Sequence, residues 1–179
     1  MTLVVNLFGG PGTGKSTTAA RLFGDLKTSK VNVELVREYV KDWAWGDRRV
    51  TPLNQLHLLG EQSYRESLLY GKVDVIVTDS PLMLCAFYQK HYGGEDYLLS
   101  TTKAFIEHSR RSAGTNHKNI FLSRTKPYDP RGRYENEQQA IAIDVSLYPW
   151  LLENDTIDAK VSYDDYGSLL ELVHEMIRS

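Results

Sequence analysis

The stretch that most constrains this chain is residues 3–17, LVVNLFGGPGTGKST. The apolar run from Leu3 to Phe8 is typical of a buried strand, and a glycine-rich segment, Gly9–Ser16, follows it at once. This segment fits the pattern G-x-x-x-x-G-K-[ST], with a strand before it and a helix after it. Glycines let the backbone curl so that successive N–H groups point at phosphate oxygens, and the next helix adds the positive end of its dipole. The sequence therefore predicts a nucleoside triphosphate site.

Each side chain of this phosphate-binding loop has an expected partner. We expect the Lys15 ammonium to reach the β- and γ-phosphates, the Ser16 hydroxyl to bind Mg²⁺, and Thr17 to contact an α-phosphate. The alternative is a glycine-rich turn without a ligand, which the agreement of strand, loop and helix disfavours. The residues expected to hold the nucleotide are Gly10, Gly12, Thr13, Gly14, Lys15, Ser16 and Thr17.

Length and composition limit the number of domains and the classes of partner that this chain can have. The 179 residues predict a single domain, 1–179, and 41% hydrophobic residues suffice for a core. The net charge of −2 gives no global sign of a nucleic-acid coat or a membrane surface, although residues 103–133 are basic and residues 134–179 acidic. The one cysteine, Cys85, excludes a disulfide within the chain. No apolar run is long enough for a membrane span, and the first residues do not resemble a signal peptide, so we expect a reduced, cytoplasmic protein.

Apolar runs and helical periodicity alternate along the whole chain. Strands are expected at 3–8, 33–36, 73–78, 119–122 and 159–163. Helices are expected at 15–26, 51–70 (with Thr51 as cap and Pro52 in the first turn), 82–92, 97–111, 134–152 and 165–177, and residues 40–50 are mixed. This order predicts an α/β fold with an open parallel sheet, helices on both faces and right-handed crossovers. Ligands of such sheets bind at the carboxyl ends of the strands.

Two acidic residues follow predicted strands. Asp79 comes after the strand 73–78 and is a candidate Mg²⁺ ligand, with a helix N-cap as the alternative. Glu38 follows the strand 33–36, and it could accept the proton of an attacking hydroxyl or orient a water molecule. The alternative for Glu38 is an ion pair with Arg37.

A basic loop with two prolines and a glycine covers about residues 124–134. Phosphoryl transfer needs cations around the oxygens of the moving group, and a mobile loop can supply them while excluding water. We therefore predict a lid rather than an ordinary solvated loop. Its catalytic candidates are Arg124, Arg131 and Arg133, with Lys126 beside them.

An aromatic group after Glu38 is a candidate acceptor site. Tyr39, Trp43 and Trp45 offer rings on which a flat molecule such as a nucleobase can stack, or they belong to the core. On the helix that follows, Gln62 and Arg65 are candidates for reading the polar edges of an acceptor, together with Gln55. The five histidines show no metal-ligand spacing, so no transition-metal site is predicted.

Four segments together resemble the P-loop nucleoside and nucleotide kinase superfamily, and within it the ribosylnicotinamide kinase domain of NadR-like proteins and the AAA-type family grouped with them. The segments are GGPGTGKST at 9–17, REYV at 37–40, DSP at 79–81 and PYDPRGRYE at 127–135. This resemblance implies a P-loop NTPase fold with sheet order 2-3-1-4-5, ATP as phosphoryl donor and Mg²⁺ as cofactor.

Two other groups of kinases also resemble parts of this sequence. Deoxynucleoside kinases carry Glu-Pro-Val after the second strand, with the Glu as base; Glu38-Tyr39-Val40 is similar, but Asp79-Ser80-Pro81 departs from their Glu-Arg-Ser. Adenylate-kinase-like enzymes need an arginine for the phosphate of a nucleotide acceptor. The candidates for that role are Arg37, Arg48, Arg49 and Arg65.

Three functions remain open from the sequence. The first is a kinase that moves the γ-phosphoryl group of ATP to a nucleoside- or nucleotide-like small molecule. The second has the same fold but a DNA or RNA end as acceptor, which the basic stretch 103–133 favours and the net charge of −2 does not. The third is a regulatory ATPase whose only acceptor is water. A dimer is compatible with all three.

Overall fold

A computed structural model describes all residues, 1–179. Its centre is a five-stranded sheet in the order β2-β3-β1-β4-β5, and every neighbouring pair of strands is parallel. This confirms the predicted P-loop NTPase fold and its strand order. The strands are β1 (Thr2–Phe8), β2 (Val33–Val36), β3 (Val75–Thr78), β4 (Thr115–Ser123) and β5 (Ala159–Ser162).

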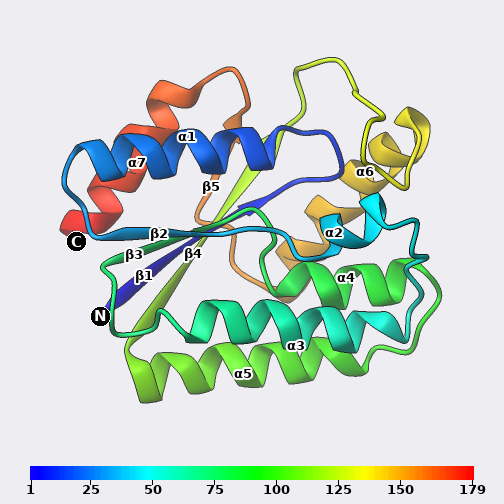
Figure 1. Cartoon of the computed structure of the whole chain (residues 1–179), viewed down its shortest axis with the longest axis horizontal. Coiled ribbons are helices and arrows are strands. Elements are labelled where there is room, and N and C mark those ends of the chain that lie inside the picture. The colour runs from blue at the N-terminus through cyan, green and yellow to red at the C-terminus, as the bar shows by residue number, and fades with distance from the viewer.

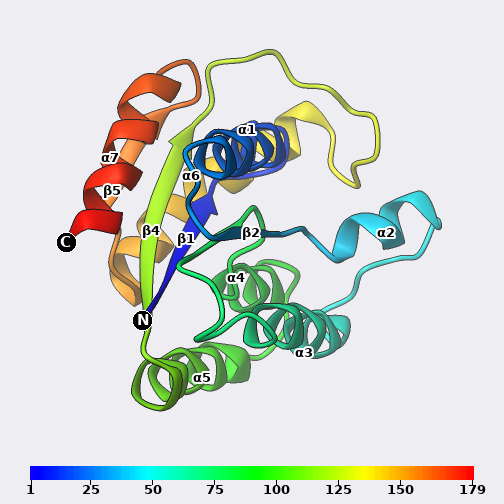
Figure 2. The same ribbon diagram turned by 60° about the vertical axis from the view of Figure 1, so that its left-hand side comes forward.

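Helices cover both faces of the sheet (Figures 1 and 2). The helices α1 and α7 pack on one face with one hydrophobic cluster, and α3, α4, α5 and α6 pack on the other with a second cluster. The short α2 lies beyond the end of β2. The helices are α1 (Lys15–Thr28), α2 (Val40–Trp45), α3 (Asn54–Ser67), α4 (Met83–His91), α5 (Tyr97–Ala113), α6 (Glu137–Asn154) and α7 (Tyr166–Arg178). None of these helices is long and apolar enough to cross a lipid bilayer.

The central strand β1 explains why the chain opens on an apolar run. All seven of its residues are buried, because strands β3 and β4 flank it and helices cover both of its faces. Val5 and Leu7 face the α1–α7 cluster, whereas Phe8 faces the cluster of α3, α4 and α6. The glycine-rich loop therefore follows the central, fully buried strand of the sheet.

The strand β4 is longer than its sequence predicts. It begins at Thr115 rather than at residue 119, and it pairs with β1 from Thr2↔Thr115 to Phe8↔Phe121. The added residues are polar, so they lack the apolar signal of a buried strand. The first residue of the predicted strand, Asn119, is polar too, and its Oδ1 accepts a hydrogen bond of 2.8 Å from the Asn6 amide on β1. Backbone pairing with β1 extends the strand where side-chain hydrophobicity does not mark it.

Two helices begin later than predicted, each because of local hydrogen bonds made by an asparagine side chain. Helix α3 begins at Asn54 and not at Thr51-Pro52, since the backbone N–H and the hydroxyl of Thr51 both donate to Asn54 Oδ1. Helix α6 begins at Glu137 rather than at residue 134, because Asn136 and Gln139 form a capping box. Within the mixed segment 40–50 the structure forms the six-residue α2.

A buried carboxyl group lies between the helices under the sheet. Glu66 on α3 is completely buried, accepts a hydrogen bond from the Tyr70 hydroxyl at 3.1 Å, and leaves Oε1 without a partner. Burial raises its pKa to about 8, although the Tyr70 hydrogen bond opposes the shift. Near neutral pH the folded protein therefore holds Glu66 mainly in its neutral form.

We expect the free energy of unfolding to fall as pH rises from 4.5 through 8. The folded pKa lies above the ordinary value, so the contribution of Glu66 is complete below 4.5 and is lost above 8, with about 3 kcal/mol lost by pH 7. Urea unfolding at several pH values measures this slope. Glu66→Gln should flatten it, and Glu61→Gln on the same helix is the control. An unchanged slope in Glu66→Gln would assign the pH dependence to other groups.

Candidate active site

The glycine-rich loop has the geometry of a phosphate cradle. Gly14 has φ +100° and directly precedes α1, which begins at Lys15. The N–H groups of Gly12 and Gly14 make no backbone hydrogen bond, so they are free to bind an anion. The Lys15 ammonium folds across the loop and donates to the carbonyls of Gly9 at 2.7 Å and Gly10 at 3.0 Å. A bound phosphate would offer this ammonium stronger, charged acceptors.

Three different parts of the chain pack closely against the glycines of this loop. A Cβ on Gly10 would collide with the Asp144 carboxylate of α6, and a Cβ on Gly14 would collide with the ring of Tyr163, which follows β5. A Cβ on Gly12, where φ is +80°, would lie 2.8 Å from the ring of Tyr128 in the lid. Side chains are therefore excluded by packing and by backbone conformation together.

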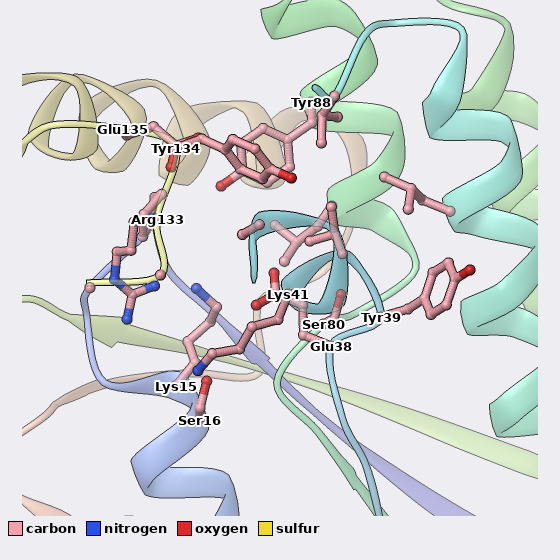
Figure 3. A pocket seen from close by; sticks show the side chains of 18 of the residues that line it. Lys15, Ser16, Glu38, Tyr39, Lys41, Ser80, Tyr88, Arg133, Tyr134 and Glu135 are labelled. Carbon is pink, nitrogen blue, oxygen red and sulfur yellow. The ribbon is translucent and has the colours of Figure 1, made fainter. Parts of the chain in front are cut away.

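A cavity of 170 Å³ opens beside the loop (Figure 3). One end is formed by the loop and the start of α1, and the other by α3 and α4, with the lid residues Gly132–Glu135 along one side. Glu38 lies between the two ends (Figure 3). The predicted site residues that line the cavity are Gly12, Gly14, Lys15, Ser16, Thr17, Glu38, Tyr39, Gln62 and Arg133, with Gln55 and Lys126.

A cluster of three charged residues joins the ends of β1, β2 and β3, with Lys15 and Glu38 half-buried at the cavity and Asp79 buried. Asp79 is buried, and its Oδ1 accepts a hydrogen bond of 2.9 Å from the backbone N–H of Glu38. Burial lowers the pKa of Lys15, while Glu38 and Asp79 counteract that shift. Burial likewise raises the pKa of the Glu38 carboxyl, and the Lys15 ammonium opposes the rise. A carboxylate with a raised pKa beside a phosphate site suits the work of a general base.

The residues at this end of the cavity fit a magnesium ion carried by a nucleotide. Mg²⁺ prefers oxygen ligands and takes most of them from phosphates and water, so the protein supplies only one or two. Ser16 lines the cavity. Asp79 does not line it but lies buried behind Glu38, where one carboxylate oxygen accepts from the Glu38 N–H and the other is left for an ion. No group of three or more His, Cys, Asp or Glu residues forms a metal site of its own.

The basic residues of the lid are in three different situations. Arg133 lines the cavity and reaches toward Lys15, on whose pKa its charge acts (Figure 3). Arg131 is 84% exposed and pairs with Asp129 in the lid itself. Arg124 is held beneath the lid, with Nε 2.6 Å from Asp144 and Nη2 2.6 Å from the carbonyl of Pro11. Of the three predicted arginines, the structure therefore brings only Arg133 to the cavity, and Arg124 is fixed rather than mobile.

Several predicted acceptor residues lie outside the cavity. Trp43 is buried, with its ring stacked on His57 at 5.6 Å between centroids. The guanidinium of Arg65 lies 4.6 Å from the centre of the Tyr39 ring, and Arg37 is exposed. Trp45 packs against Gly132 of the lid. Gly10 and Thr13 act inside the loop, where the Thr13 hydroxyl donates to the Gly10 carbonyl.

The sequence did not single out the aromatic wall of the cavity. Tyr88 on α4 and Tyr92, the residue that follows the end of α4, lie one turn apart with stacked rings, and Tyr134 of the lid faces Tyr88 (Figure 3). The Tyr92 hydroxyl donates to Glu135 Oε1 at 2.8 Å, which ties the lid to α4. The i, i+4 spacing of Tyr88 and Tyr92 was a visible signal, but only the fold shows that this face borders the loop.

A family model described as an AAA domain matches residues 4–156. The match spans the sheet from β1 through β4 and includes the glycine-rich loop, Glu38, Asp79 and the lid. The chain belongs to this AAA domain family. No curated protein sequence matches the chain.

Solved structures share the fold at low sequence identity. The NadR protein in complex with NR superposes with a TM-score of 0.73 and 17% identity, over 99% of this chain and 52% of that one. The Mycobacterium tuberculosis APS kinase CysC in complex with AMPPNP and APS superposes with a TM-score of 0.56 and 15% identity, over 99% of this chain and 98% of the other. APE1195 superposes with a TM-score of 0.54 and 17% identity, over 99% of this chain and 95% of that chain. These likenesses establish a P-loop kinase-like fold; this family member spans about half of the NadR chain.

Gly14→Ala should weaken ATP binding at least tenfold, because the methyl group meets Tyr163 and strains a backbone with φ +100°. Gly24→Ala in α1, the helix that Gly14 precedes, is the matched control, since nothing lies within 4 Å of the added Cβ. That control should retain affinity and gain up to about 1 kcal/mol of stability. Calorimetric titration with Mg·ATP measures both variants, and equal affinities would contradict the packing argument.

Proposed function

We propose that this protein is a kinase that transfers the γ-phosphoryl group of ATP to a hydroxyl group of a nucleoside-like small molecule. The observation that carries the proposal is the division of one cavity into two ends by Glu38. The loop end carries the charge pattern of a triphosphate site. The other end is walled by aromatic, aliphatic and amide side chains, which suit a flat organic molecule. A site whose only acceptor is water would not need this second end.

The second end favours an acceptor without a phosphate group. None of the arginines considered for an acceptor phosphate lines the cavity, namely Arg37, Arg48, Arg49 and Arg65. The carboxylates of Glu38 and Glu135 line it, and the cations in its lining are Lys15, Lys41, Lys126 and Arg133. A phosphate placed among these carboxylates would be repelled, whereas a hydroxyl can donate to either of them. This supports a nucleoside-like rather than a nucleotide-like acceptor.

Amide and aromatic groups supply the expected contacts for a ring. Gln55 and Gln62 are buried on the inner face of α3, and Gln62 Oε1 has no partner within the chain. An unpaired buried oxygen is costly unless a donor meets it, so an N–H group of the ligand is the expected partner. Tyr88 and Tyr134 provide faces on which the ring of the acceptor can lie.

The residues perform separate parts of the transfer. The acceptor hydroxyl oxygen attacks the γ-phosphorus, the bond to the oxygen that bridges the β- and γ-phosphates breaks, and Glu38 takes the hydroxyl proton. Lys15 and Arg133 neutralise charge on the moving group and on the ADP that leaves. Mg²⁺, held by Ser16 and Asp79, would supply further neutralisation of the phosphate oxygens. Gly132–Glu135 cover the site and exclude water.

A polynucleotide acceptor has less support than a small molecule. The basic residues in 103–133 do not form one free surface, because Arg110 and Arg111 pair with Glu107 and Lys118 pairs with Asp158. Arg124 is buried against Asp144. The acceptor end of the cavity also lies between α3, α4 and the lid, which suits a compact acceptor better than a strand.

The proposal is tested with γ-labelled ATP and parallel sets of acceptors. Nucleosides, ribosylnicotinamide, nucleoside monophosphates and 5′-hydroxyl oligonucleotides are each supplied with Mg²⁺. We expect label on one of the first two sets, because these offer a ring and a free hydroxyl without a phosphate. Label only on monophosphates or oligonucleotides would refute the acceptor class. Label released only as inorganic phosphate with every acceptor would refute the kinase and favour a regulatory ATPase.

Glu38→Gln should lower kcat by about 10²–10⁴-fold, because the general base is lost. The rate of the parent should fall as pH drops, since the base must be ionised, and the raised pKa places this limb above the ordinary value of 4.5. A pH–rate profile shows whether the limb disappears from the residual activity of the variant. Glu34→Gln, on β2 and paired with Lys27 at the surface, is the control. A near-parental rate in Glu38→Gln would remove Glu38 as base.

A further inference from the structure

The carboxylate of Asp144 on α6 bridges two parts of the nucleotide site. Its Oδ1 accepts a hydrogen bond of 2.7 Å from the backbone N–H of Gly10, and its Oδ2 accepts one of 2.6 Å from Arg124 Nε. Arg124 then donates from Nη2 to the carbonyl of Pro11 at 2.6 Å. These three hydrogen bonds link Asp144, Arg124 and the Gly10–Pro11 segment in a closed ring, which we call the clamp; it holds the first half of the loop from its outer side. In the second half of the loop, the N–H groups of Gly12 and Gly14 stay free for phosphate.

The clamp leaves one buried donor without a partner. Arg124 Nη1 is inaccessible to solvent and makes no hydrogen bond. It lies 3.1 Å from the position that a Cβ on Gly12 would occupy, under the ring of Tyr128. A buried guanidinium nitrogen without an acceptor is costly, so its direction toward the loop indicates a missing acceptor there. The triphosphate expected at this loop carries oxygens of the right charge.

We propose that Asp144 is a positioning residue for nucleotide binding, which acts by fixing Arg124 and the first half of the loop in one arrangement. Tyr128 covers Nη1 in this structure, so its ring has to turn aside before Nη1 meets an oxygen of the bound nucleotide, but the guanidinium itself does not have to be ordered at the moment of binding. This inference rests on the proposed use of a nucleotide by the same site, but not on any acceptor.

Because Asp144 is charged, its effect on nucleotide binding depends on its partner Arg124. A lone carboxylate beside the loop would repel a triphosphate, and its field already reaches Lys15, where it offsets a small part of the lowering of the pKa by burial. The guanidinium of Arg124 neutralises it, and both side chains are largely buried, with 15% and 18% exposed. Removing Arg124 alone therefore leaves an unpaired acid at the nucleotide site.

The chain contains a closely matched control. Asp158 accepts 2.8 Å and 2.9 Å hydrogen bonds from the backbone N–H of Asn119 and from the Lys118 ammonium. Its side chain is also 18% exposed, and it does not line the nucleotide cavity. Truncating either aspartate removes one backbone contact and one ion pair, so loss of stability alone affects both variants alike.

The test compares Mg·ATP affinity by calorimetric titration and melting temperature for the parent, Asp144→Ala, Asp144→Asn and Asp158→Ala. We expect the Kd of Asp144→Ala to rise at least tenfold and that of Asp158→Ala to stay within twofold. Asp144→Asn should be intermediate, because its amide oxygen can still accept from Gly10. The double variant Arg124→Ala/Asp144→Ala should bind ATP more tightly than Arg124→Ala alone.

Two results would overturn the proposal. One is a Kd within twofold of the parent in Asp144→Ala, or in Asp144→Asn if the alanine variant does not fold. The other is an equal rise of Kd in Asp144→Ala and Asp158→Ala, which would mean a purely structural role. A protein that shows the expected affinities but phosphorylates no acceptor would refute the kinase and leave the role of Asp144 standing.

Discussion

The site depends on a loop that can exist only without side chains at three positions. Gly10, Gly12 and Gly14 are each in contact with a different part of the chain: helix α6, the lid and the segment after β5. These contacts support the loop from outside, so its inner side keeps a fixed curve with free N–H groups. A phosphate site formed in this way is preorganised, because the cost of ordering it is met during folding. The glycines are thus required by the packing of the whole domain as well as by the ligand.

Buried charge is the second condition for the site. Lys15, Glu38 and Asp79 meet at the ends of three neighbouring strands, where the Lys15 ammonium offsets the charge of the two carboxylates, which repel each other. The parallel sheet brings them together because all its strands end at the same edge. A nucleotide adds negative charge to this cluster, and the cations Lys15 and Arg133 are placed to meet it. Away from the site, Glu66 shows the alternative outcome, in which a carboxyl without a cation is kept neutral.

The sequence predicted the fold well because its signals were local and consistent. Five apolar runs separated by helical periodicity allow few arrangements other than a parallel sheet, and the strand order came from the family resemblance and is confirmed. The errors were local as well. The polar start of β4 carries no strand signal, and the beginnings of α3 and α6 depend on Asn54 and Asn136, whose side chains bond to their neighbours. Such bonds compete with helix formation and shift boundaries by a few residues.

For the site, the sequence by itself determined the glycine-rich loop with Lys15 and Ser16, and it indicated Glu38 and Asp79, because these residues directly follow strands. Their position relative to a strand end is fixed by the chain itself. Only the tertiary structure decided which arginine reaches the cavity and that Trp43 belongs to the core. It also decided that Tyr88, Glu135 and Asp144 border the nucleotide site, although they lie far from the loop in sequence. The reason is physical: the direction of a side chain on a long loop or helix is set by what packs against it, and that neighbour is not adjacent in the chain.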